Sequence, residues 1–328
     1  MGLNSKAYLA ADLLAKTILK KPTRDGYGDG VVEAGKRDPN IVVCCADLTE
    51  STRSLAFKKA FPERFVQFGV SEQSLAAIAA GMALAGKVPF ISSYAMFSPG
   101  RNWEMIRTNI ALNNVNVKIV GAHSGVSVGP DGATHQAVED MAITRVIPRM
   151  TVVAPCDVHE SKKATIAAAA FVGPVYLRFT REKTPVFTTA KTPFKIGRAE
   201  VFRFGKHVTI VACGPLVHNA LLAAAQLAKK GIDCEVIDNH TVKPMDAKTI
   251  IASAKKTRRV VTVEEHQVQG GMGSRVAEIL AASLPVPMEF VGMQDCFGES
   301  GNPDELIEHF GMGVSAIMKA VQKVMKRT

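Results

Sequence analysis

The side chains best suited to proton transfer gather in one glycine-rich segment, G-A-H-S-G-V-S-V-G-P-D-G-A-T-H-Q at 121–136. It holds His123, Asp131 and His135 among four glycines, and it follows the apolar run 115–120. Two imidazoles and a carboxylate, on a backbone that a ligand can approach closely, suit proton transfer and hydroxyl binding. Taken alone, the segment is equally well interpreted as a surface loop with incidental histidines.

Two further segments have side chains that suit a cofactor. Glu72, in F-G-V-S-E-Q-S-L at 68–75, falls in the first turn of a predicted helix that Ser71 can cap. The helix dipole favours a glutamate there, and the functional alternative is a buried carboxylate aimed at a cofactor nitrogen. Tyr94 and Phe97, in Y-A-M-F-S-P-G at 94–100, either present flat faces to an aromatic ring or fill the core.

Three other motifs need a decision. A-D-L-T-E-S-T-R at 46–53 brings Asp47 and Ser51 to a strand end, where a polar loop with a helix cap is the simpler interpretation. D-G-Y-G-D-G at 25–30 resembles a dinucleotide loop, but no apolar strand precedes it. Its G-D-G also opens a known metal and diphosphate motif, but the downstream asparagine of that motif is missing, so we expect no metal ligands. G-G-M-G-S at 270–274 favours a structural helix start over an anion site.

These motifs sit in a repeated strand–helix pattern. Short β-branched runs predict buried parallel strands at 41–45, 88–91, 115–120, 151–153 and 175–179, with helices at 71–85 and 159–170. The pattern resumes with strands at 208–213, 233–237, 259–263 and 288–290, and helices at 216–230, 274–282 and 314–326. Repeated βα units predict an α/β fold with mainly parallel sheets flanked by helices, which bind ligands at the carboxyl ends of the strands.

The pattern breaks near 181–206, where the sequence has two prolines at 185 and 193 and no helical period. We interpret this stretch as a linker between two α/β domains, at 1–190 and 191–328. An amphipathic N-terminal helix is expected within the first. The length of 328 residues suits two domains of about 150 residues each.

Composition narrows the class of protein. Hydrophobic residues make up 47% and charged residues 21%, as in globular proteins, and no apolar run reaches the roughly 20 residues of a membrane span. The net charge of +10 suits phosphorylated substrates or an acidic partner, while the dispersed lysines and arginines argue against nucleic acid. Six cysteines without a C-x-x-C pair predict free thiols in a reducing cytoplasm, in preference to disulfides or zinc ligands.

The order of the motifs carries more information than any one of them. Asp47, Glu72, Phe97 and the segment from His123 to His135 occur in the order found in the second half of transketolases, which the chain resembles from about residue 20 to its end. A-D-L-T-x-S, the Glu after F-G, and D-G-x-T-H-Q are together specific to transketolases and deoxyxylulose-phosphate synthases, and A-D-L-T-E-S favours transketolase. V-E-E-H-Q-V-Q-G-G-M-G at 263–273 resembles the family's C-terminal domain. The resemblance implies a pyrimidine-binding domain followed by a transketolase C-terminal domain.

The resemblance also implies roles for individual residues. Glu72 would hydrogen-bond the aminopyrimidine ring of thiamine diphosphate, Tyr94 and Phe97 would pack on that ring, and Asp47 would lie near the cofactor. Glu72 would act in catalysis together with His123 and His135. The residues expected to bind the phosphosugar are Arg24, Ser51, His123, Asp131, His135 and Arg181, with arginine suited to phosphate by its two-pronged geometry.

Three positions depart from the family pattern. Gly100 stands where many transketolases have a third aromatic residue, and Gln73 stands where histidine is common. F-T-R-E-K-T-P at 179–185 replaces the common S-R-Q-N-L-P around Arg181. These changes bear on substrate detail and leave the expected chemistry in place.

The chain carries no motif for the domain that binds the diphosphate and Mg²⁺ (or Ca²⁺). The resemblance therefore implies a separate N-terminal subunit that supplies this domain in an α2β2 assembly. The expected activity is transfer of a two-carbon ketol unit between phosphosugars, as in the pentose phosphate pathway, and only in the presence of that subunit. The alternatives are a deoxyxylulose-phosphate synthase-like subunit, the beta subunit of a 2-oxoacid dehydrogenase, or a regulatory protein that has lost the chemistry. D-G-A-T-H-Q and A-D-L-T-E-S argue against the dehydrogenase.

Overall fold

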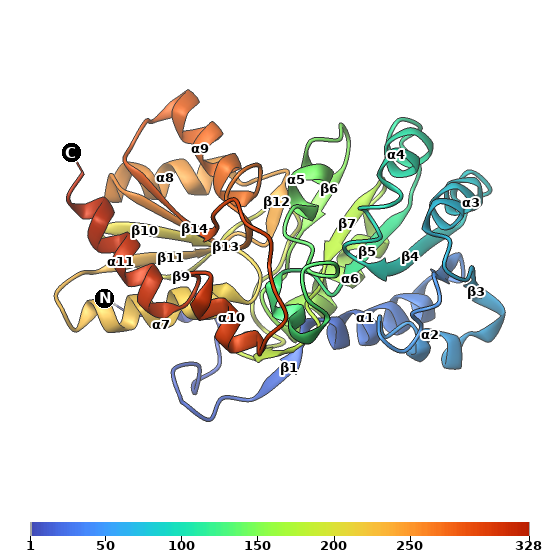
Figure 1. Ribbon diagram of the computed structural model, residues 1–328, viewed down its shortest axis with the longest axis horizontal. Helices are drawn as coiled ribbons and strands as arrows, with labels where there is room; N and C mark the ends of the chain where they lie inside the picture. Colours follow the sequence, from blue (N-terminus) through green and yellow to red (C-terminus); the bar gives the residue numbers. More distant parts are fainter. Residues whose placement is uncertain (1, 328) are drawn as a thin grey trace.

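The structure is a computed structural model that describes residues 2–327, and it contains two large sheets with helices on both faces of each (Figure 1). The first sheet has seven strands in the order β12-β6-β7-β5-β4-β2-β3. Six of them run parallel: β2 (Ile41–Cys45), β3 (Phe65–Gln67), β4 (Val88–Tyr94), β5 (Lys118–Ala122), β6 (Thr151–Val153) and β7 (Val175–Arg178). Strands such as β2 are buried at every position because helices cover both faces, which is why the sequence shows continuous apolar runs.

The second sheet has five strands in the order β14-β13-β10-β11-β9. Four are parallel, β10 (Val208–Ala212), β11 (Cys234–Asp238), β13 (Val260–Gln267) and β14 (Met288–Met293), and β9 (Glu200–Arg203) is antiparallel. A small antiparallel pair, β1 (Lys20–Pro22) with β8 (Lys183–Pro185), stands apart from both. Two mainly parallel sheets flanked by helices confirm the predicted fold class.

The helices divide between the faces of the sheets. On the first sheet, α1 (Thr23–Arg37) and α6 (Val158–Ala170) contribute to one apolar core, and α3 (Glu72–Leu84) contributes to another. On the second sheet, α7 (Leu216–Ala228) and α11 (Val314–Met325) share one core, while α8 (Ala247–Thr257) and α9 (Met272–Ser283) lie in the other. The shorter helices are α2 (Leu55–Ala60), α4 (Trp103–Met105), α5 (Asp140–Arg145) and α10 (Pro303–His309). Within residues 2–327, none of these helices has the length and apolar character to cross a membrane.

The two sheets are joined through a buried arginine at the end of β7. The Nε of Arg178 donates to Asp140 Oδ2 at 2.8 Å, and its Nη2 donates to the backbone carbonyl of Glu265, on β13, at 2.9 Å. Tyr176 donates its hydroxyl to the same Asp140 oxygen at 2.6 Å. The Arg178 guanidinium keeps the pKa of the Asp140 carboxyl below its ordinary value despite burial, so both groups are charged. The chain also crosses between the sheets. Strand β12 (Thr241–Lys243) lies in the second half of the sequence, but it pairs antiparallel with β6 of the first sheet.

The prediction of an amphipathic helix at the N-terminus is wrong. Only a single 3₁₀ turn forms, at Ser5–Ala7, and it ends at Tyr8 in the left-handed region with φ of 49°. The neighbouring backbone donors bond across to other segments: Asn4 N–H donates to the Phe202 carbonyl and Ala10 N–H to the Phe187 carbonyl, each at 2.9 Å. Since those bonds replace the i→i−4 pattern, the segment lies along the second sheet, and its apolar side chains join the core there.

The glycine-rich segment 25–30 lies inside helix α1, which the sequence pattern did not predict. A Cβ at Gly26 would lie 2.2 Å from the backbone oxygen of Val158, and one at Gly30 would lie 2.8 Å from the Thr165 Cβ. Both neighbours belong to α6. The glycines therefore allow α1 and α6 to pack closely, and they form no phosphate-binding loop.

A pair of glycine substitutions tests this interpretation. Gly26→Ala is expected to lower the free energy of unfolding by about 1–3 kcal/mol, because the new methyl group meets rigid backbone. Gly81→Ala on α3 is the matched control, since a Cβ there meets no atom within 4 Å. It should raise the free energy of unfolding by about 0.5–1 kcal/mol through helix propensity. Urea unfolding followed by circular dichroism measures both, and effects of the same sign would contradict the packing argument.

Candidate active site

The predicted site residues lie at the carboxyl edge of the first sheet. Tyr94 is the last residue of β4, and His123 follows β5 directly. Asp47 and Ser51 follow β2, and Arg181 follows β7. Parallel strands bring their carboxyl ends to one edge, which explains how residues spread over the sequence converge. The remaining residues reach this edge from helix starts, Arg24 in the first turn of α1 and Glu72 in the first turn of α3.

Four aromatic and imidazole rings pack together at this edge. The Tyr94 ring stacks on the His123 ring with centroids 3.8 Å apart and on the Phe97 ring at 6.0 Å. His135 meets Phe97 edge-on at 5.3 Å and Tyr94 at 6.1 Å. Tyr94, Phe97 and His135 are each half-buried, so the cluster is partly exposed to solvent. The structure therefore brings together both predicted histidines and both predicted aromatic residues.

Glu72 is a buried carboxylate with one free oxygen. Its side chain is 1% exposed, and its Oε1 accepts a hydrogen bond from Ser93 Oγ at 3.1 Å. Among the described residues, its Oε2 has no hydrogen-bond partner, and the Nη1 of Arg101 stands 3.8 Å away. Asn102 donates to the Glu72 backbone carbonyl at 3.0 Å, which fixes the start of α3. Buried carboxylate oxygens are normally hydrogen-bonded, so this oxygen is suited to a donor from a ligand.

His123 is held as a neutral ring with a defined tautomer. Burial, followed by the positive charges of Arg24 and Arg181, lowers the pKa of His123 to about 3. Arg24 Nη1 lies 3.2 Å from His123 Nε2, and a guanidinium can only donate, so Nε2 is the acceptor. The proton of the neutral ring is then on Nδ1, which is buried and has no partner among residues 2–327. His123 is therefore neutral near pH 7 in this structure, and its Nδ1–H is an unused hydrogen-bond donor.

The phosphate candidates form two groups around this ring cluster. Arg24 Nη1 also donates to the Ser51 backbone carbonyl at 2.8 Å, so Arg24 ties that loop to His123. Burial, and then the positive charge of Arg53, lower the pKa of Arg24 from its ordinary value. Arg181 lies on the far side of the loop, where its Nη1 donates to the Val128 carbonyl at 2.8 Å and stands 3.6 Å from Asp131 Oδ1.

Asp47 has different neighbours from the other predicted residues. It is exposed, its backbone is in the left-handed region with φ of 57°, and its carboxylate accepts from Gln67 Nε2 at 2.8 Å. It lies at the same carboxyl edge, but next to β2 and β3, which are the last two strands in the order of the sheet. Asp47 therefore shares the carboxyl edge of the sheet with the other predicted residues, but its side-chain bond is to Gln67 and not to the ring cluster.

Two contacts with the second domain, made through Glu265 and through Gln136 of the first domain, support the loop between His123 and His135, and the sequence did not reveal them. Glu265, on β13, accepts the Ser127 backbone N–H through its Oε1 at 2.7 Å. The buried Gln136 donates its Nε2 to the Val126 carbonyl at 3.0 Å and to the Glu299 carbonyl at 2.9 Å. The motif V-E-E-H-Q marked the family's C-terminal domain, but only the tertiary structure shows that its second glutamate holds the loop between His123 and His135.

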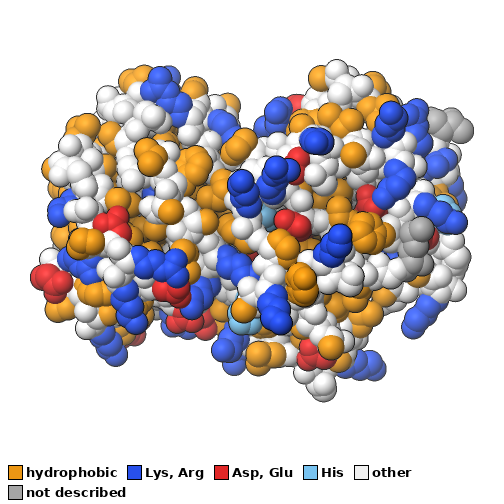
Figure 2. Space-filling model, turned by 180° about the vertical axis from the view of Figure 1, so that it is seen from behind, with side chains coloured by type: hydrophobic (Ala, Val, Ile, Leu, Met, Phe, Trp, Pro, Cys, Tyr) orange, Lys and Arg blue, Asp and Glu red, His pale blue; other side chains and the backbone are white. Residues whose placement is uncertain are grey.

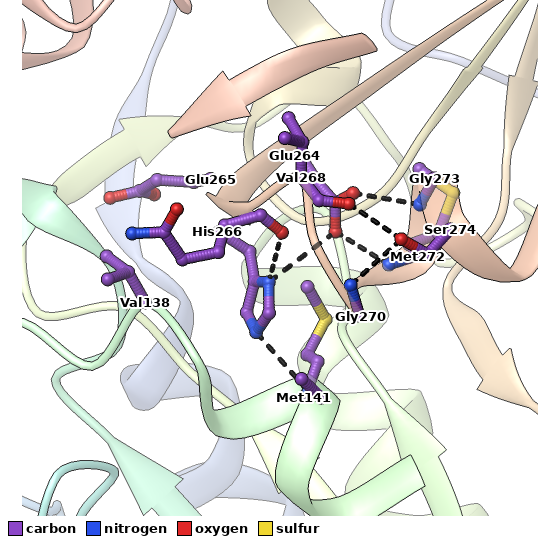
Figure 3. A network of polar contacts seen from close by, with 12 residues as sticks. Val138, Met141, Glu264, Glu265, His266, Val268, Gly270, Met272, Gly273 and Ser274 are labelled. Atoms are coloured by element: carbon purple, nitrogen blue, oxygen red, sulfur yellow. Dashed lines mark hydrogen bonds and ion pairs between the residues drawn. The ribbon is translucent and has the colours of Figure 1, made fainter. Parts of the chain in front are cut away.

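The adjacent glutamate of that motif explains the glycines at 270–273. Glu264 accepts the backbone N–H groups of Met272 at 2.7 Å and Gly273 at 2.8 Å, at the start of α9 (Figure 3). Burial raises the pKa of Glu264 to about 7 although both amide bonds oppose that change. His266 lies beside it, and burial lowers its pKa to about 4. The helix N-terminus is therefore occupied by the chain's own carboxylate, which supports the structural interpretation of G-G-M-G-S.

The charges on the surface are spread out. Figure 2 shows lysine and arginine side chains scattered over both lobes on the face that it presents, with acidic side chains among them. A cleft of about 650 Å³ is lined by basic Lys21, Arg53 and Lys59 and by acidic Asp25, Asp29 and Glu50. This mixed distribution is unlike the basic stripe of nucleic-acid-binding proteins.

Fold and site together describe two joined α/β domains with a ligand-binding edge on the first. Residues 20–186 match the family model "Transketolase, pyrimidine binding domain", and residues 197–317 match "Transketolase, C-terminal domain". A relative from Methanocaldococcus jannaschii, "Putative transketolase C-terminal section", is 42% identical over 94% of this chain and 97% of its own length. The mouse "Transketolase-like protein 2" is 37% identical over 93% of this chain and 49% of its own length.

A solved structure gives the same result. "Split gene transketolase, inactive beta4 tetramer" superimposes with a TM-score of 0.87 and 44% identity, covering 93% of this chain and 98% of that chain. The chain belongs to the transketolase family. The two matched domains and the order of the motifs confirm the resemblance that the sequence indicated.

The electrostatic account of His123 can be tested by removing its cationic neighbour. Arg24→Gln is expected to raise the pKa of His123 above about 3, while burial keeps it below the ordinary 6.5. Titration of ¹⁵N-labelled imidazoles by nuclear magnetic resonance measures this shift. Arg107→Gln removes an exposed guanidinium and should leave His123 unchanged. Identical His123 titrations in Arg24→Gln and the wild type would contradict the account.

Proposed function

We propose that this chain is the C-terminal subunit of a split, thiamine-diphosphate-dependent transketolase that transfers a two-carbon ketol unit between phosphosugars. The observation that carries the proposal is the buried carboxylate of Glu72, with one free oxygen, beside the stacked rings of Tyr94 and Phe97. The similarity to a split gene transketolase over almost the whole chain supports it.

The residues present fit the pyrimidine end of thiamine diphosphate. The free Oε2 of Glu72 accepts a hydrogen bond from a ring nitrogen, and Ser93 holds the other oxygen so that Oε2 keeps its direction. The faces of Phe97 and Tyr94 suit packing on a flat heteroaromatic ring. Asp47 stands at the same edge, near the end of the sheet. When bound, the cofactor supplies the electron sink for breaking and forming the carbon–carbon bond.

The polar residues around the ring cluster suit a phosphosugar. His123 donates from Nδ1 to a sugar oxygen, and its stacking on Tyr94 fixes the direction of that bond. His135 and Asp131 offer further hydroxyl contacts, and His135 is positioned to relay protons. The phosphate is expected at Arg24, Ser51 and Arg181, since guanidinium groups bind phosphate oxygens in pairs.

A separate N-terminal subunit completes the site in this proposal. It carries the motif that binds the diphosphate, and it supplies most of the ligands of the Mg²⁺ (or Ca²⁺) ion. The two subunits assemble as α2β2. The mouse relative, which is about twice as long as this chain, supports a separate second half, and the inactivity of the beta4 tetramer of a split gene transketolase supports the need for a partner. The exposed Val70, Ile78 and Leu84, on and beside α3, are apolar surface that suits a subunit interface.

The domain boundary and the setting follow from the same features. We place the pyrimidine-binding domain at 1–190 and the transketolase C-terminal domain at 191–328, with the linker near 181–206; the two family matches end at 186 and resume at 197. All six cysteines are free thiols, which supports a reducing, cytoplasmic location. A place in pentose phosphate metabolism follows from the proposed reaction.

The first test is a ketol-transfer assay with thiamine diphosphate, Mg²⁺, xylulose 5-phosphate and ribose 5-phosphate. The pure chain is expected to be inactive, and the chain mixed with its N-terminal subunit is expected to be active. Turnover by the pure chain at ordinary enzyme rates would overturn the two-subunit proposal. A stable complex without ketol transfer would overturn the assigned reaction.

Glu72→Gln tests the role of the free carboxylate oxygen. Turnover of the assembled enzyme is expected to fall by about 10²- to 10⁴-fold, because an amide of the same shape is a poor partner for a protonated ring nitrogen. Glu104→Gln, at an exposed glutamate on α4, is the control and should retain activity. Cofactor binding measured by calorimetry separates loss of binding from loss of turnover, and unchanged turnover in Glu72→Gln would remove Glu72 from the mechanism.

A further inference from the structure

A second cluster of reactive side chains lies between the two sheets, away from the ring cluster. Cys156 follows β6, Glu160 is in the first turn of α6, and Asp238 is the last residue of β11. The Cys156 sulfur and one carboxylate oxygen from each acid lie within 4.8 Å of one another. All three side chains are buried, with at most 1% exposure. Two domains thus contribute to one compact set of sulfur and oxygen atoms.

The carboxylates of this cluster lack the hydrogen bonds that buried acids normally have. Among residues 2–327, no donor from outside the cluster bonds either oxygen of Asp238 or Glu160 Oε1, and the two acids lie close enough to share a hydrogen bond when one of them is protonated. The other oxygen of Glu160, Oε2, accepts the Cys156 backbone N–H at 2.7 Å. A buried carboxylate without donors is costly, so these free oxygens require a proton or a cation.

Neighbouring groups do not meet this requirement. The donors nearby converge on Asp157, which accepts from the backbone N–H groups of Phe187 at 2.9 Å and Thr188 at 2.6 Å and caps α6. Lys163, one turn further along α6, donates to the Thr189 and Thr192 carbonyls at 2.6 Å each. His240, two residues after Asp238, is buried and leaves its Nε2 without a partner in the described structure.

We propose that Cys156, Glu160 and Asp238 form a binding site for a divalent transition-metal ion of the Zn²⁺ type. Cysteine sulfur and carboxylate oxygen are both established zinc ligands, with bonds of about 2.0–2.3 Å, so a small contraction of the cluster seats the ion. The Cys156 N–H bond to Glu160 Oε2 orients Glu160 Oε1 toward the centre, as outer contacts of metal ligands do. Water completes the coordination.

Metal binding balances the charges of the cluster. Cysteine and the acids bind a divalent ion in their deprotonated forms, so metal binding displaces the thiol proton, and any proton that the two acids share, to solvent. No oxidant or reductant is involved. The bound ion then links α6, which packs on the first sheet, with β11 of the second.

The sequence could not predict this site. Its ligands are four and 78 positions apart and belong to different domains, so no C-x-x-C or histidine spacing indicates them. We therefore expected six plain thiols. Of these, Cys156 has two carboxylates close to its sulfur, whereas the sulfur of Cys44, on β2, contacts the sulfur of Met82.

Cobalt binding to the full-length, untagged chain, stripped of metal with a chelator, tests the site. The wild type is expected to take up one equivalent of Co²⁺ with a sulfur-to-cobalt charge-transfer band, and Zn²⁺ should displace it. Cys156→Ser should lose the band, Asp238→Asn should bind Co²⁺ at least about tenfold more weakly, and Cys44→Ser should match the wild type. A band that persists in Cys156→Ser, or wild-type protein without a saturable band, would overturn the proposal.

A second measurement on the wild type guards against variants that fail to fold. One equivalent of Zn²⁺ is expected to raise the urea midpoint and to release protons, detected with a pH indicator, whereas Mg²⁺ should do neither. If Zn²⁺ changes neither the midpoint nor the proton count, the two acids share a proton instead and the site holds no metal.

Discussion

The buried guanidinium of Arg178 is the interaction on which the arrangement of the site depends. Arg178 is the last residue of β7 in the first sheet. Its guanidinium neutralises Asp140 and donates to the backbone of β13 in the second sheet. The histidine loop between β5 and Asp140 is held between these contacts and the carboxylate of Glu265. Removing one partner of such a buried pair typically costs about 3–5 kcal/mol, because the other charge is left uncompensated. The geometry of the site is thus set by the junction of the two domains as much as by the strands that carry its residues.

The site combines cationic and neutral groups. Arg24 and Arg181 are half-buried, while His123 is buried between Arg24, which contacts its Nε2, and the stacked ring of Tyr94. A protonated imidazole in that position would meet two like charges in a poorly solvated place. The structure therefore separates charge, which attracts a phosphate, from hydrogen-bond donation, which directs a sugar oxygen.

The predictable parts of the molecule were those encoded by local pattern. Strands β2 and β6 were bounded correctly because buried parallel strands are continuous apolar runs, and candidate residues such as Tyr94 and His123 were predicted at the ends of such runs. Helix α1 was not predicted, because its glycines suggest a loop. In the structure these glycines allow close packing against α6. The N-terminal segment has apolar residues that look helical, but its backbone bonds to the second sheet. The supports Glu265 and Gln136 are tertiary contacts between distant segments, which no local pattern encodes.

The crossing of β12 into the first sheet has a consequence for synthesis on the ribosome. The outer edge of β6 is covered only by residues 241–243, so the first sheet keeps an unpaired edge until the chain has grown well beyond its last own strand, β7. The N-terminal segment likewise waits for β9 before its Asn4 side chain can bond the Val201 carbonyl. Nascent first domains therefore carry an open strand edge and a loose leading segment at the same time. Such edges recruit foreign strands, so the interval between residues 178 and 241 is when the growing chain most needs a chaperone.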